Sequence, residues 1–194
     1  MNKIYIVNLT DLKNIKMDYS SFDQTIVDHL NKKSCFDDLF LSFWGYYSIQ
    51  TVLKTKIKID FSKKPKIING PFFNLTHSKN YIAFFLSDEE VGIDIEIKNR
   101  HISDALLEKC LCDEEKKFLP KDKEKFFLSC WVKKEAYLKF LGDGINTRME
   151  NINSFQIPNC ETLELDDIIL GFCYSSKKPE ICIYDPLLLK CIEV

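Results

Sequence analysis

The 194-residue sequence predicts an α+β fold in which helices pack on antiparallel sheets. Two short apolar segments, Tyr81–Leu86 and Val91–Ile97, read as strands joined by a polar turn. Two longer segments, Asp37–Leu53 and Lys123–Leu141, have the length and apolar content of helices that pack on a sheet. Strand-like segments return after the second helix, so strands and helices are mixed along the chain.

The elements follow in order along the chain. Lys3–Asn8 is expected to be a strand because its four central residues are apolar. The helix Asp37–Leu53 is followed by a loop at Phe61–Pro71, where Lys, Pro, Asn and Gly accumulate. Ser103 or Asp104 is expected to cap a helix that runs to about Phe118, and Pro120 ends it. The helix from Lys123 ends at Gly142, and the remaining predicted strands are Ser154–Ile157, Ile168–Ser175 and Glu180–Tyr184.

Composition is that of an ordinary soluble protein, with 45% hydrophobic and 29% charged residues. No apolar run has the length of a bilayer span, and the first residues lack the apolar core of a signal peptide. We therefore expect a cytoplasmic protein with no membrane partner. The net charge of −2 argues against general binding of nucleic acid, which requires a strongly basic surface.

The eight cysteines show no pattern typical of a metal site or a disulfide framework. Cys110 and Cys112 form the only close pair, and no CxxC pair is present. Most of the cysteines are expected to be small buried apolar residues. The lysines between residues 116 and 125 alternate with acids and predict a solvated helix end and loop.

The strand Val91–Ile97 carries the first candidate site residues. Its apolar residues alternate with Gly92, Asp94 and Glu96, which share the other face. The two acids lie about 6–7 Å apart along the strand, close enough to bind one hard cation such as Mg²⁺. The alternative for an isolated pair of this kind is a half-buried strand that exposes its acids to water.

The helix Lys123–Leu141 carries the second set. Trp131, Glu135 and Lys139 recur every four residues and lie along one helical face. A surface ion pair between Glu135 and Lys139, worth about 0.2–0.5 kcal/mol, is one interpretation. The other is a third carboxylate for the cation and an ammonium for a phosphate. The segment Gly142-Asp143-Gly144 predicts a tight turn close to the same place.

The segment Phe73–Ser78 carries the third set. Thr76, His77 and Ser78 offer hydrogen-bond donors suited to phosphate oxygens. The alternative is a structural histidine with hydroxyl residues that serve a turn.

The three motifs in this order, F-N-x-[ST]-H-S, G-I-D-I-E and W-x-x-K-E-A-x-x-K followed by G-x-G, resemble the phosphopantetheinyl transferase superfamily. Within it the chain is similar to the long, single-chain type that activates surfactin synthetase (the Sfp type), over about Ser62–Gly144. The resemblance implies two similar α+β halves, residues 1–92 and 93–194, related by a pseudo-twofold axis. It implies that coenzyme A binds in the cleft between the halves. The chain is long enough to hold both halves of a site, which implies a monomer rather than the trimer of the short holo-acyl-carrier-protein synthases.

The resemblance assigns roles to the acids and the lysine. Asp94, Glu96 and Glu135 match the ligands of Mg²⁺, and in similar relatives a water fills the metal position at Ile95. Lys139 is expected to neutralise charge on the leaving phosphate. Either Glu135 or a metal-bound water is expected to be the base that accepts the serine proton.

The resemblance also assigns contacts with coenzyme A, to Ser42, Lys64, Thr76, His77 and Lys139. Lys63 stands where the family motif has a glycine before Lys64, and Leu41 stands where near relatives have an arginine before Ser42. The contact with the 3′-phosphate is therefore left open between Lys32, Lys33 and another base.

The implied reaction is Mg²⁺-dependent transfer of 4′-phosphopantetheine from coenzyme A to a serine of an acyl or peptidyl carrier protein, which releases adenosine 3′,5′-bisphosphate. Leu106, Leu107 and Leu111 are candidates for an apolar groove that receives the carrier, although each of them is equally suited to pack inward. Two alternatives are a non-catalytic module that binds coenzyme A or a nucleotide, and a metal-dependent phosphohydrolase. The intact acids and Lys139 argue against the first of these.

Overall fold

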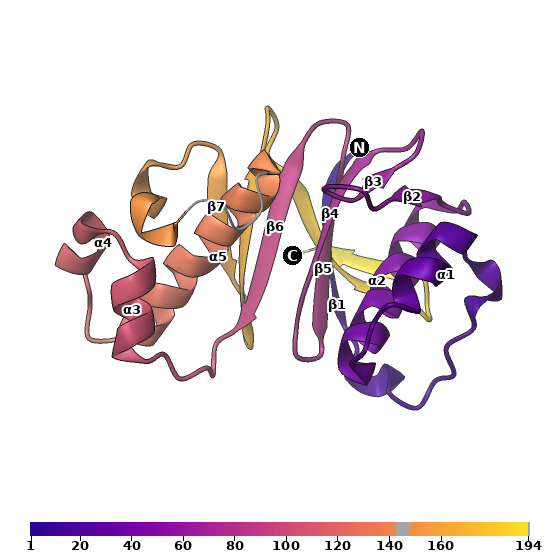
Figure 1. Ribbon diagram of the computed structural model, residues 1–194, viewed down its shortest axis with the longest axis horizontal. Coiled ribbons are helices and arrows are strands. Elements are labelled where there is room, and N and C mark those ends of the chain that lie inside the picture. Colours follow the sequence, from indigo (N-terminus) through magenta and orange to yellow (C-terminus); the bar gives the residue numbers. More distant parts are fainter. Residues whose placement is uncertain (143–147, 194) are drawn as a thin grey trace. The chain divides into compact units, whose positions relative to one another are not determined.

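The computed structural model describes residues 1–142 and 148–193, which divide into two compact units (Figure 1). Unit 1 consists of residues 1–89 and 179–194, and unit 2 of residues 90–178. The predicted halves, 1–92 and 93–194, differ from these units at both boundaries. The last strands return to the first unit because they pair with the first strand of the chain.

Unit 1 is built on a five-stranded sheet with the order β10-β9-β1-β5-β4. Its strands are β1 (Asn2–Asn8), β4 (Phe72–Ser78), β5 (Tyr81–Ser87), β9 (Glu180–Asp185) and β10 (Lys190–Glu193). β1 pairs with β5 antiparallel and with β9 parallel. The sheet is therefore mixed, whereas a purely antiparallel sheet was expected. A separate two-stranded sheet joins β2 (Ile59–Asp60), which directly precedes the predicted loop region, to β3 (Lys66–Ile67), which lies within it.

Helix α2 (Phe36–Leu53) supplies much of the core of unit 1, together with α1 (Gln24–Leu30) and the 3₁₀ turns η1 (Thr10–Leu12) and η2 (Tyr19–Ser21). Phe43 and Trp44 of α2 are buried, and Tyr5 of β1 stacks on Phe84 of β5 with ring centroids 4.8 Å apart. The prediction of a helix from Asp37 to Leu53 is therefore confirmed to within one residue.

Unit 2 is built on a three-stranded antiparallel sheet with the order β6-β8-β7. The strands are β6 (Val91–Ile97), β7 (Cys160–Glu164) and β8 (Ile168–Tyr174). Helix α5 (Lys123–Leu141) packs against this sheet, as predicted, and the shorter elements are α3 (Asp104–Cys110), α4 (Asp113–Lys117), η4 (Met149–Asn151) and η5 (Ser154–Gln156). β5 and β6 thus follow one another in sequence but belong to different sheets.

Two predictions in unit 2 are wrong, and both for a local reason. The segment predicted as a strand at Ser154–Ile157 forms η5, because the Asn153 side chain accepts a hydrogen bond from the Phe155 amide at 3.0 Å. The helix predicted to run to Phe118 breaks into α3 and α4. Leu111 is extended there, and the Glu115 carboxylate accepts a hydrogen bond from the Cys112 amide at 2.9 Å.

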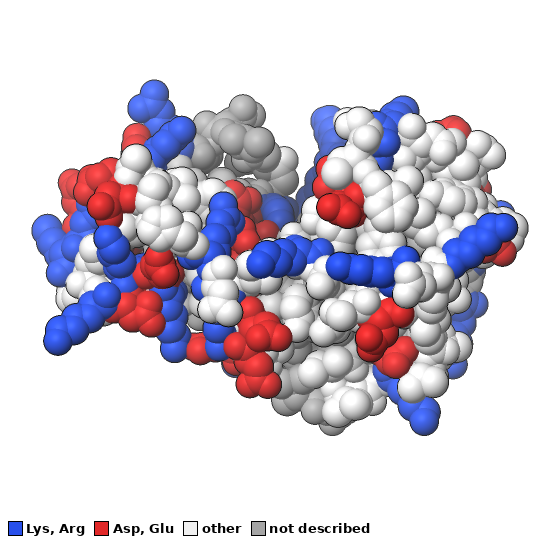
Figure 2. Space-filling model, turned by 90° about the horizontal axis from the view of Figure 1, so that it is seen from below, with Lys and Arg blue, Asp and Glu red and all other residues white. Residues whose placement is uncertain are grey.

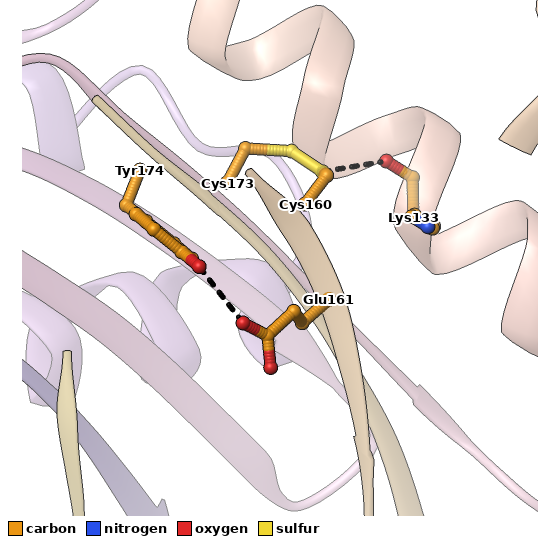
Figure 3. Close-up of a disulfide and its surroundings, with 5 residues drawn as sticks. All are labelled: Lys133, Cys160, Glu161, Cys173 and Tyr174. Atoms are coloured by element: carbon orange, nitrogen blue, oxygen red, sulfur yellow. Dashed lines mark hydrogen bonds between the residues drawn. A yellow bond between two sulfur atoms is a disulfide. The ribbon is translucent and has the colours of Figure 1, made fainter. Parts of the chain in front are cut away.

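The cysteine prediction is also corrected at one place. Cys160 of β7 and Cys173 of β8 are directly opposed and form a disulfide (Figure 3). Cys160 Sγ lies 3.6 Å from the carbonyl oxygen of Lys133, so the disulfide lies against α5. Four other cysteines are buried thiols, as predicted: Cys110, Cys112, Cys130 and Cys182. Within residues 1–142 and 148–193, no helix combines the length and apolar content required to cross a membrane.

Candidate active site

Two glycines bring α5 unusually close to the sheet of unit 2. A Cβ placed on Gly92 of β6 would overlap the carbonyl oxygen of Ala136 and lie 2.5 Å from the amide nitrogen of Phe140. A Cβ on Gly171 of β8 would lie 2.8 Å from the amide nitrogen of Lys133. Since the face of β6 that carries Gly92 also carries Asp94 and Glu96, these acids lie on the side of the strand that meets α5.

Asp94 and Lys139 meet across this contact. Lys139 Nζ donates to Asp94 Oδ1 at 2.6 Å. The Asp94 side chain is 10% exposed and the Lys139 side chain 30% exposed, so the pair is partly shielded from water. Lys139 is thus linked to the strand acid rather than only to its helical neighbour Glu135, and the interpretation as a simple surface pair on α5 does not hold.

Glu135 lies within the electrostatic field of the same acids. Burial raises the pKa of its carboxyl, and the negative charges of Asp94 and Glu96 raise it further, while Lys139 lowers it. Glu135 is half-buried on α5, four residues before Lys139. The structure therefore brings all four residues of the first two motifs into one electrostatic environment in unit 2.

Glu96 has a partner that the sequence motifs did not indicate. Arg100 Nη1 donates to Glu96 Oε1 at 2.6 Å, just beyond the end of β6. The four-residue separation is the only sequence signal for this pair, and it is uninformative outside a helix.

Asp94, Glu96 and Glu135 fit a divalent cation chemically. The charges of Asp94 and Glu96 raise the pKa of Glu135, and a hard cation that takes oxygen ligands would offset this repulsion. In the described part of the chain, however, no three acidic, histidine or cysteine side chains are grouped closely enough to hold a metal. The Asp94 carboxylate is engaged by Lys139 instead. Asp94, Glu96 and Glu135 are the residues that could hold a cation, after Lys139 leaves Asp94.

The third motif lies in unit 1, on β4. Thr76 is buried and His77 is exposed, and as neighbours in a strand they point to opposite faces of the sheet. Leu75 shares the face of His77, and Gly45 of α2 packs against the Leu75 side chain. His77 thus lies on the face that α2 covers, and Thr76 on the other. The segment pairs with β5 along its whole length, and Ser78 borders the two-residue turn at Lys79 and Asn80.

The remaining predicted contacts occupy different environments. Ser42 is buried on α2, and Lys64 is half-buried between β2 and β3. Leu107 and Leu111 are 6% and 1% exposed and belong to the core of unit 2, so inward packing is the correct interpretation for both, and Leu106 packs partly against the same core. Asp143 and Gly144 of the predicted turn lie outside the described residues, whereas Gly142 ends α5 with a positive φ of 74°.

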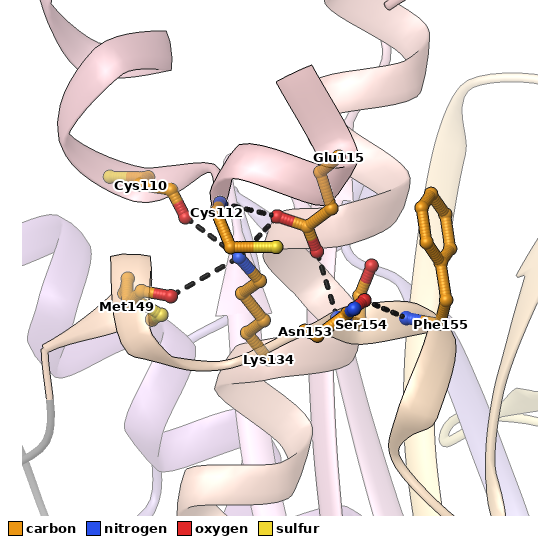
Figure 4. A network of polar contacts seen from close by, with 8 residues as sticks. All are labelled: Cys110, Cys112, Glu115, Lys134, Met149, Asn153, Ser154 and Phe155. Carbon is orange, nitrogen blue, oxygen red and sulfur yellow. Dashed lines mark hydrogen bonds and ion pairs between the residues drawn. The ribbon is translucent and has the colours of Figure 1, made fainter. Parts of the chain in front are cut away.

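A buried ion pair in unit 2 was missed by sequence reasoning (Figure 4). Lys134 Nζ donates to Glu115 Oε2 at 2.6 Å, to the Cys110 carbonyl at 2.8 Å and to the Met149 carbonyl at 3.1 Å. Both side chains are within 1% of complete burial. Lys134 is the first lysine of the motif W-x-x-K-E-A-x-x-K, whereas Lys133 falls on a variable position, but the motif alone gave Lys134 no role.

The Glu115 carboxylate is fully satisfied by this network. Its Oε1 accepts from the Ser154 amide at 2.8 Å, and its Oε2 accepts from the Cys112 amide as well as from Lys134. Burial by itself would raise the pKa of Glu115, but the hydrogen bonds from Lys134 and Ser154 hold it below its usual value. The pair therefore joins α3, α4, α5 and the η4–η5 segment.

Comparison with known proteins identifies relatives of this chain. Residues 90–177 match the 4′-phosphopantetheinyl transferase superfamily. The chain is 31% identical over 121 residues to 4′-phosphopantetheinyl transferase HetI of Nostoc sp., which covers 56% of this chain and 49% of that protein. It is 27% identical over 176 residues to 4′-phosphopantetheinyl transferase gsp of Aneurinibacillus migulanus, with 86% of this chain and 70% of that protein covered. The chain spans about half the length of the first of these relatives.

A solved structure, the holo-[acyl-carrier-protein] synthase (AcpS) of Thermotoga maritima, overlaps 52% of this chain and 71% of its own with 20% identity. The TM-score is 0.32, which is too low to establish a common fold.

Proposed function

We propose, from the membership of residues 90–177 in the 4′-phosphopantetheinyl transferase superfamily, that this protein transfers 4′-phosphopantetheine from coenzyme A to a serine of a carrier protein. One observation carries the proposal: Asp94, Glu135 and Lys139 come together where α5 meets β6, inside the segment that matches the superfamily. Phosphoryl transfer depends mainly on alignment and on neutralisation of charge, and this cluster supplies the groups for both.

The acids are proposed to hold Mg²⁺, with Asp94, Glu96 and Glu135 as ligands. A bound Mg²⁺ would offset negative charge on the pyrophosphate oxygens of coenzyme A. The Lys139 ammonium, now on Asp94, would turn to the phosphate that leaves and stabilise the charge developing on it.

The serine hydroxyl oxygen forms the new bond to the β-phosphorus of coenzyme A. The bond from this phosphorus to the bridging oxygen breaks, and its electron pair leaves with adenosine 3′,5′-bisphosphate. The serine proton passes to Glu135, directly or through a water. Ligation of Mg²⁺ would lower the basicity of Glu135, so the path through a water is an equal alternative.

Coenzyme A is proposed to contact Ser42, Lys64, Thr76, His77 and Lys139. His77 is exposed on β4. Ser42 and Thr76 are only 5% exposed each, so coenzyme A could contact them only through the small part of their surface that remains accessible. A single-chain transferase of the Sfp type is supported by the similarity to gsp over 86% of this chain. Each unit packs one long helix on its sheet, α2 in the first and α5 in the second, which supports two related halves. A monomer acting in the cytoplasm completes the proposal.

The test is incubation with coenzyme A, Mg²⁺ and a purified apo carrier protein, followed by intact mass of the carrier. A mass gain of one phosphopantetheine is expected, and it should disappear in Asp94→Ala and in the presence of EDTA. Asp104→Asn, which breaks an exposed ion pair with Lys123, is the matched control and should retain full transfer.

Two outcomes would contradict the proposal. Cleavage of coenzyme A at the same rate without a carrier would indicate a phosphohydrolase. Binding of coenzyme A without any transfer across a panel of acyl and peptidyl carriers would indicate a binding module.

A further inference from the structure

Unit 2 holds a disulfide that the proposed transfer does not use. Cys160 is the first residue of β7 and lies directly opposite Cys173 of β8 (Figure 3). β7 is at the edge of the three-stranded sheet and β8 is at its centre, so the bond ties an edge strand to the central one. Breaking or forming this bond therefore changes how firmly β7 is held.

The disulfide packs under the part of α5 that carries Glu135 and Lys139. Both of its half-cystines belong to a small buried cluster, together with four apolar residues: Ala136, Leu138, Ile152 and Ile157. Ala136 and Leu138 lie between Glu135 and Lys139 in the sequence, and neither is more than 5% exposed. The apolar contacts that hold this turn of α5 are therefore made in part by the disulfide.

Two further contacts join the disulfide to the backbone of the same helix. Cys160 Sγ lies 3.6 Å from the carbonyl oxygen of Lys133, two residues before Glu135. Cys173 is paired across the sheet with Gly92, the glycine that lets β6 approach the carbonyl oxygen of Ala136. Because packed interiors transmit displacements, a shift of the two strands at the disulfide acts directly on the backbone of α5.

We propose that the Cys160–Cys173 pair is a thiol–disulfide switch that regulates the candidate site of unit 2. When the bond is closed, β7 and α5 are held together and Glu135 and Lys139 stay in place beside Asp94. When it is open, this part of α5 loosens and transfer slows. The inference rests on the proposed function, because the regulated step is the transfer. A disulfide in a protein proposed to act in the cytoplasm supports regulation, since most disulfides of that compartment are transient and either catalytic or redox-sensing.

A low-molecular-weight thiol such as glutathione is the proposed reductant. Cys160 is 5% exposed and Cys173 is 1% exposed, and the end of an edge strand opens more readily than the centre of a sheet. On the face of unit 2 seen on the left of Figure 2, basic and acidic side chains are interleaved, so no field of a single sign there opposes an anionic thiol. The thiol is therefore expected to attack at Cys160.

The exchange is balanced in two steps. A thiolate attacks Cys160 Sγ, the bond between the two sulfur atoms breaks, and its electron pair leaves on Cys173 Sγ, which takes up a proton. A second thiolate attacks the sulfur of the first and displaces Cys160 Sγ, which takes up the other proton. Two small thiols are thus oxidised to one disulfide, and the cysteine pair is reduced to two thiols. The reverse sequence closes the bond.

Counting thiols measures the state of the bond. When the parent is purified without reductant and alkylated in denaturant, six of its eight cysteines should react, and all eight should react after reduction. Peptide mass analysis should assign the protected pair to Cys160 and Cys173. In glutathione buffers that span reducing and oxidising compartments, the bond should change from open to closed. A permanent structural disulfide would stay closed throughout.

Hydrogen exchange reports on the helix without any turnover. When the bond is open, the backbone amides of residues 135–141 should exchange about tenfold faster, whereas those of α2 in unit 1 should be unchanged. Opening should also lower the urea midpoint of unit 2 by about 1 M or more, because the constraint on the unfolded chain is lost.

Transfer is then compared between the oxidised and the reduced parent. Acetyl-coenzyme A is the donor in this assay, because the free thiol of coenzyme A would itself reduce the bond. The reduced parent should transfer severalfold more slowly, and Cys160→Ala combined with Cys173→Ala should be equally slow in both buffers. Cys35→Ser combined with Cys191→Ser, which removes the two exposed thiols of unit 1, is the matched control and should keep the full response.

The outcomes separate the switch from the transfer. If hydrogen exchange of α5 responds to the bond but neither form of the parent transfers, the proposed function fails and the redox-dependent change in α5 stands. The switch is overturned if all eight cysteines react without reductant, or if the bond stays closed in every glutathione buffer. It is also overturned if the two forms of the parent exchange and transfer alike. These measurements on the parent decide the matter even if the double alanine variant does not fold.

Discussion

Loss of the Lys134 ammonium should destabilise unit 2 far more than loss of an exposed lysine. Lys134→Met removes three hydrogen bonds, to Glu115, to the Cys110 carbonyl and to the Met149 carbonyl. It leaves the buried Glu115 carboxylate with only the amides of Cys112 and Ser154 as donors. Breaking a buried ion pair by removing one partner costs about 3–5 kcal/mol, because an uncompensated charge remains.

The exposed pair between Lys123 and Asp104 gives the scale for comparison. Its side chains are 43% and 84% exposed, and Lys123→Met should cost less than about 1 kcal/mol. Adding Glu115→Gln to Lys134→Met removes the stranded charge and should recover part of the loss, so the two substitutions should be strongly non-additive.

Urea unfolding followed by tryptophan fluorescence measures the effect. The chain has two tryptophans, Trp44 in the core of unit 1 and Trp131 on α5, so a Trp44→Phe background reports on unit 2. Samples are kept without reductant so that Cys160–Cys173 stays closed. The reasoning is refuted if Lys134→Met and Lys123→Met shift the midpoint equally, or if the double variant is less stable than Lys134→Met.

The dependence of this loss on pH provides a second check. In the parent, the lowered pKa of Glu115 means that its contribution is present above the unfolded pKa of about 4.3 and is lost as pH falls through the folded value. In Lys134→Met, burial without the ammonium should raise the folded pKa instead. The gap in unfolding free energy between parent and variant should therefore narrow as pH falls from 7 to about 5.

Four further predictions concern the site and unit 1. Lys139→Met should lower kcat by orders of magnitude and also lower the Mg²⁺ concentration that is required, because Lys139 no longer competes for Asp94. Glu135→Gln should lose activity that excess Mg²⁺ restores poorly; unchanged kcat in both would refute their roles. Gly92→Ala should cost about 1–3 kcal/mol of unfolding free energy and reduce transfer, because its Cβ would push α5 off β6; a parent-like melting temperature and activity would contradict this. His77→Ala should weaken binding of coenzyme A in calorimetry and leave Mg²⁺ dependence alone, and unchanged affinity would remove His77 from the site. Burial lowers the pKa of His29, and the charges of Lys33 and Lys32 lower it further, so the unfolded state binds more protons than the folded state as pH falls below about 6.5. The free energy of unfolding should therefore drop more between pH 7.5 and 5.5 in the parent than in His29→Phe. Equal drops in the two proteins would contradict this.

The sequence predicted the parts of the fold that depend on local periodicity. Alternation in Val91–Ile97 predicted which face carries Asp94 and Glu96, and the four-residue spacing of Glu135 and Lys139 predicted that they share one side of a helix. The contact between the polar face of β6 and α5 follows from Gly92. Because glycine has no side chain, the backbone of a helix can approach a strand closely at that position. That signal was available in the sequence, but it becomes specific only when the partner helix is known.

What could not be predicted depends on contacts between residues far apart in the chain. The motif W-x-x-K-E-A-x-x-K includes Lys134 and leaves Lys133 variable, but only the position of Glu115 on α4 shows that Lys134 is the buried partner. The break between α3 and α4 has the same origin, since Glu115 accepts from the Cys112 amide. Predicting the Cys160–Cys173 disulfide would have required the register of β7 and β8. The strand predicted at Ser154–Ile157 ends before Cys160, so it gave no such register.

The parallel pairing of β1 with β9 has a consequence for the order in which the chain folds. Residues 90–178 form a continuous unit, so they can fold as soon as they have left the ribosome. Unit 1 is split, and Lys3–Ile6 of β1 can pair with β9 only after Glu180–Ile183 has been synthesised. Until then one edge of β1 is open, and its backbone amides and carbonyls are available to other chains. β1 is thus synthesised before β9 but completed only after it, and the nascent protein is most prone to aggregation while β9 and β10 are still being added.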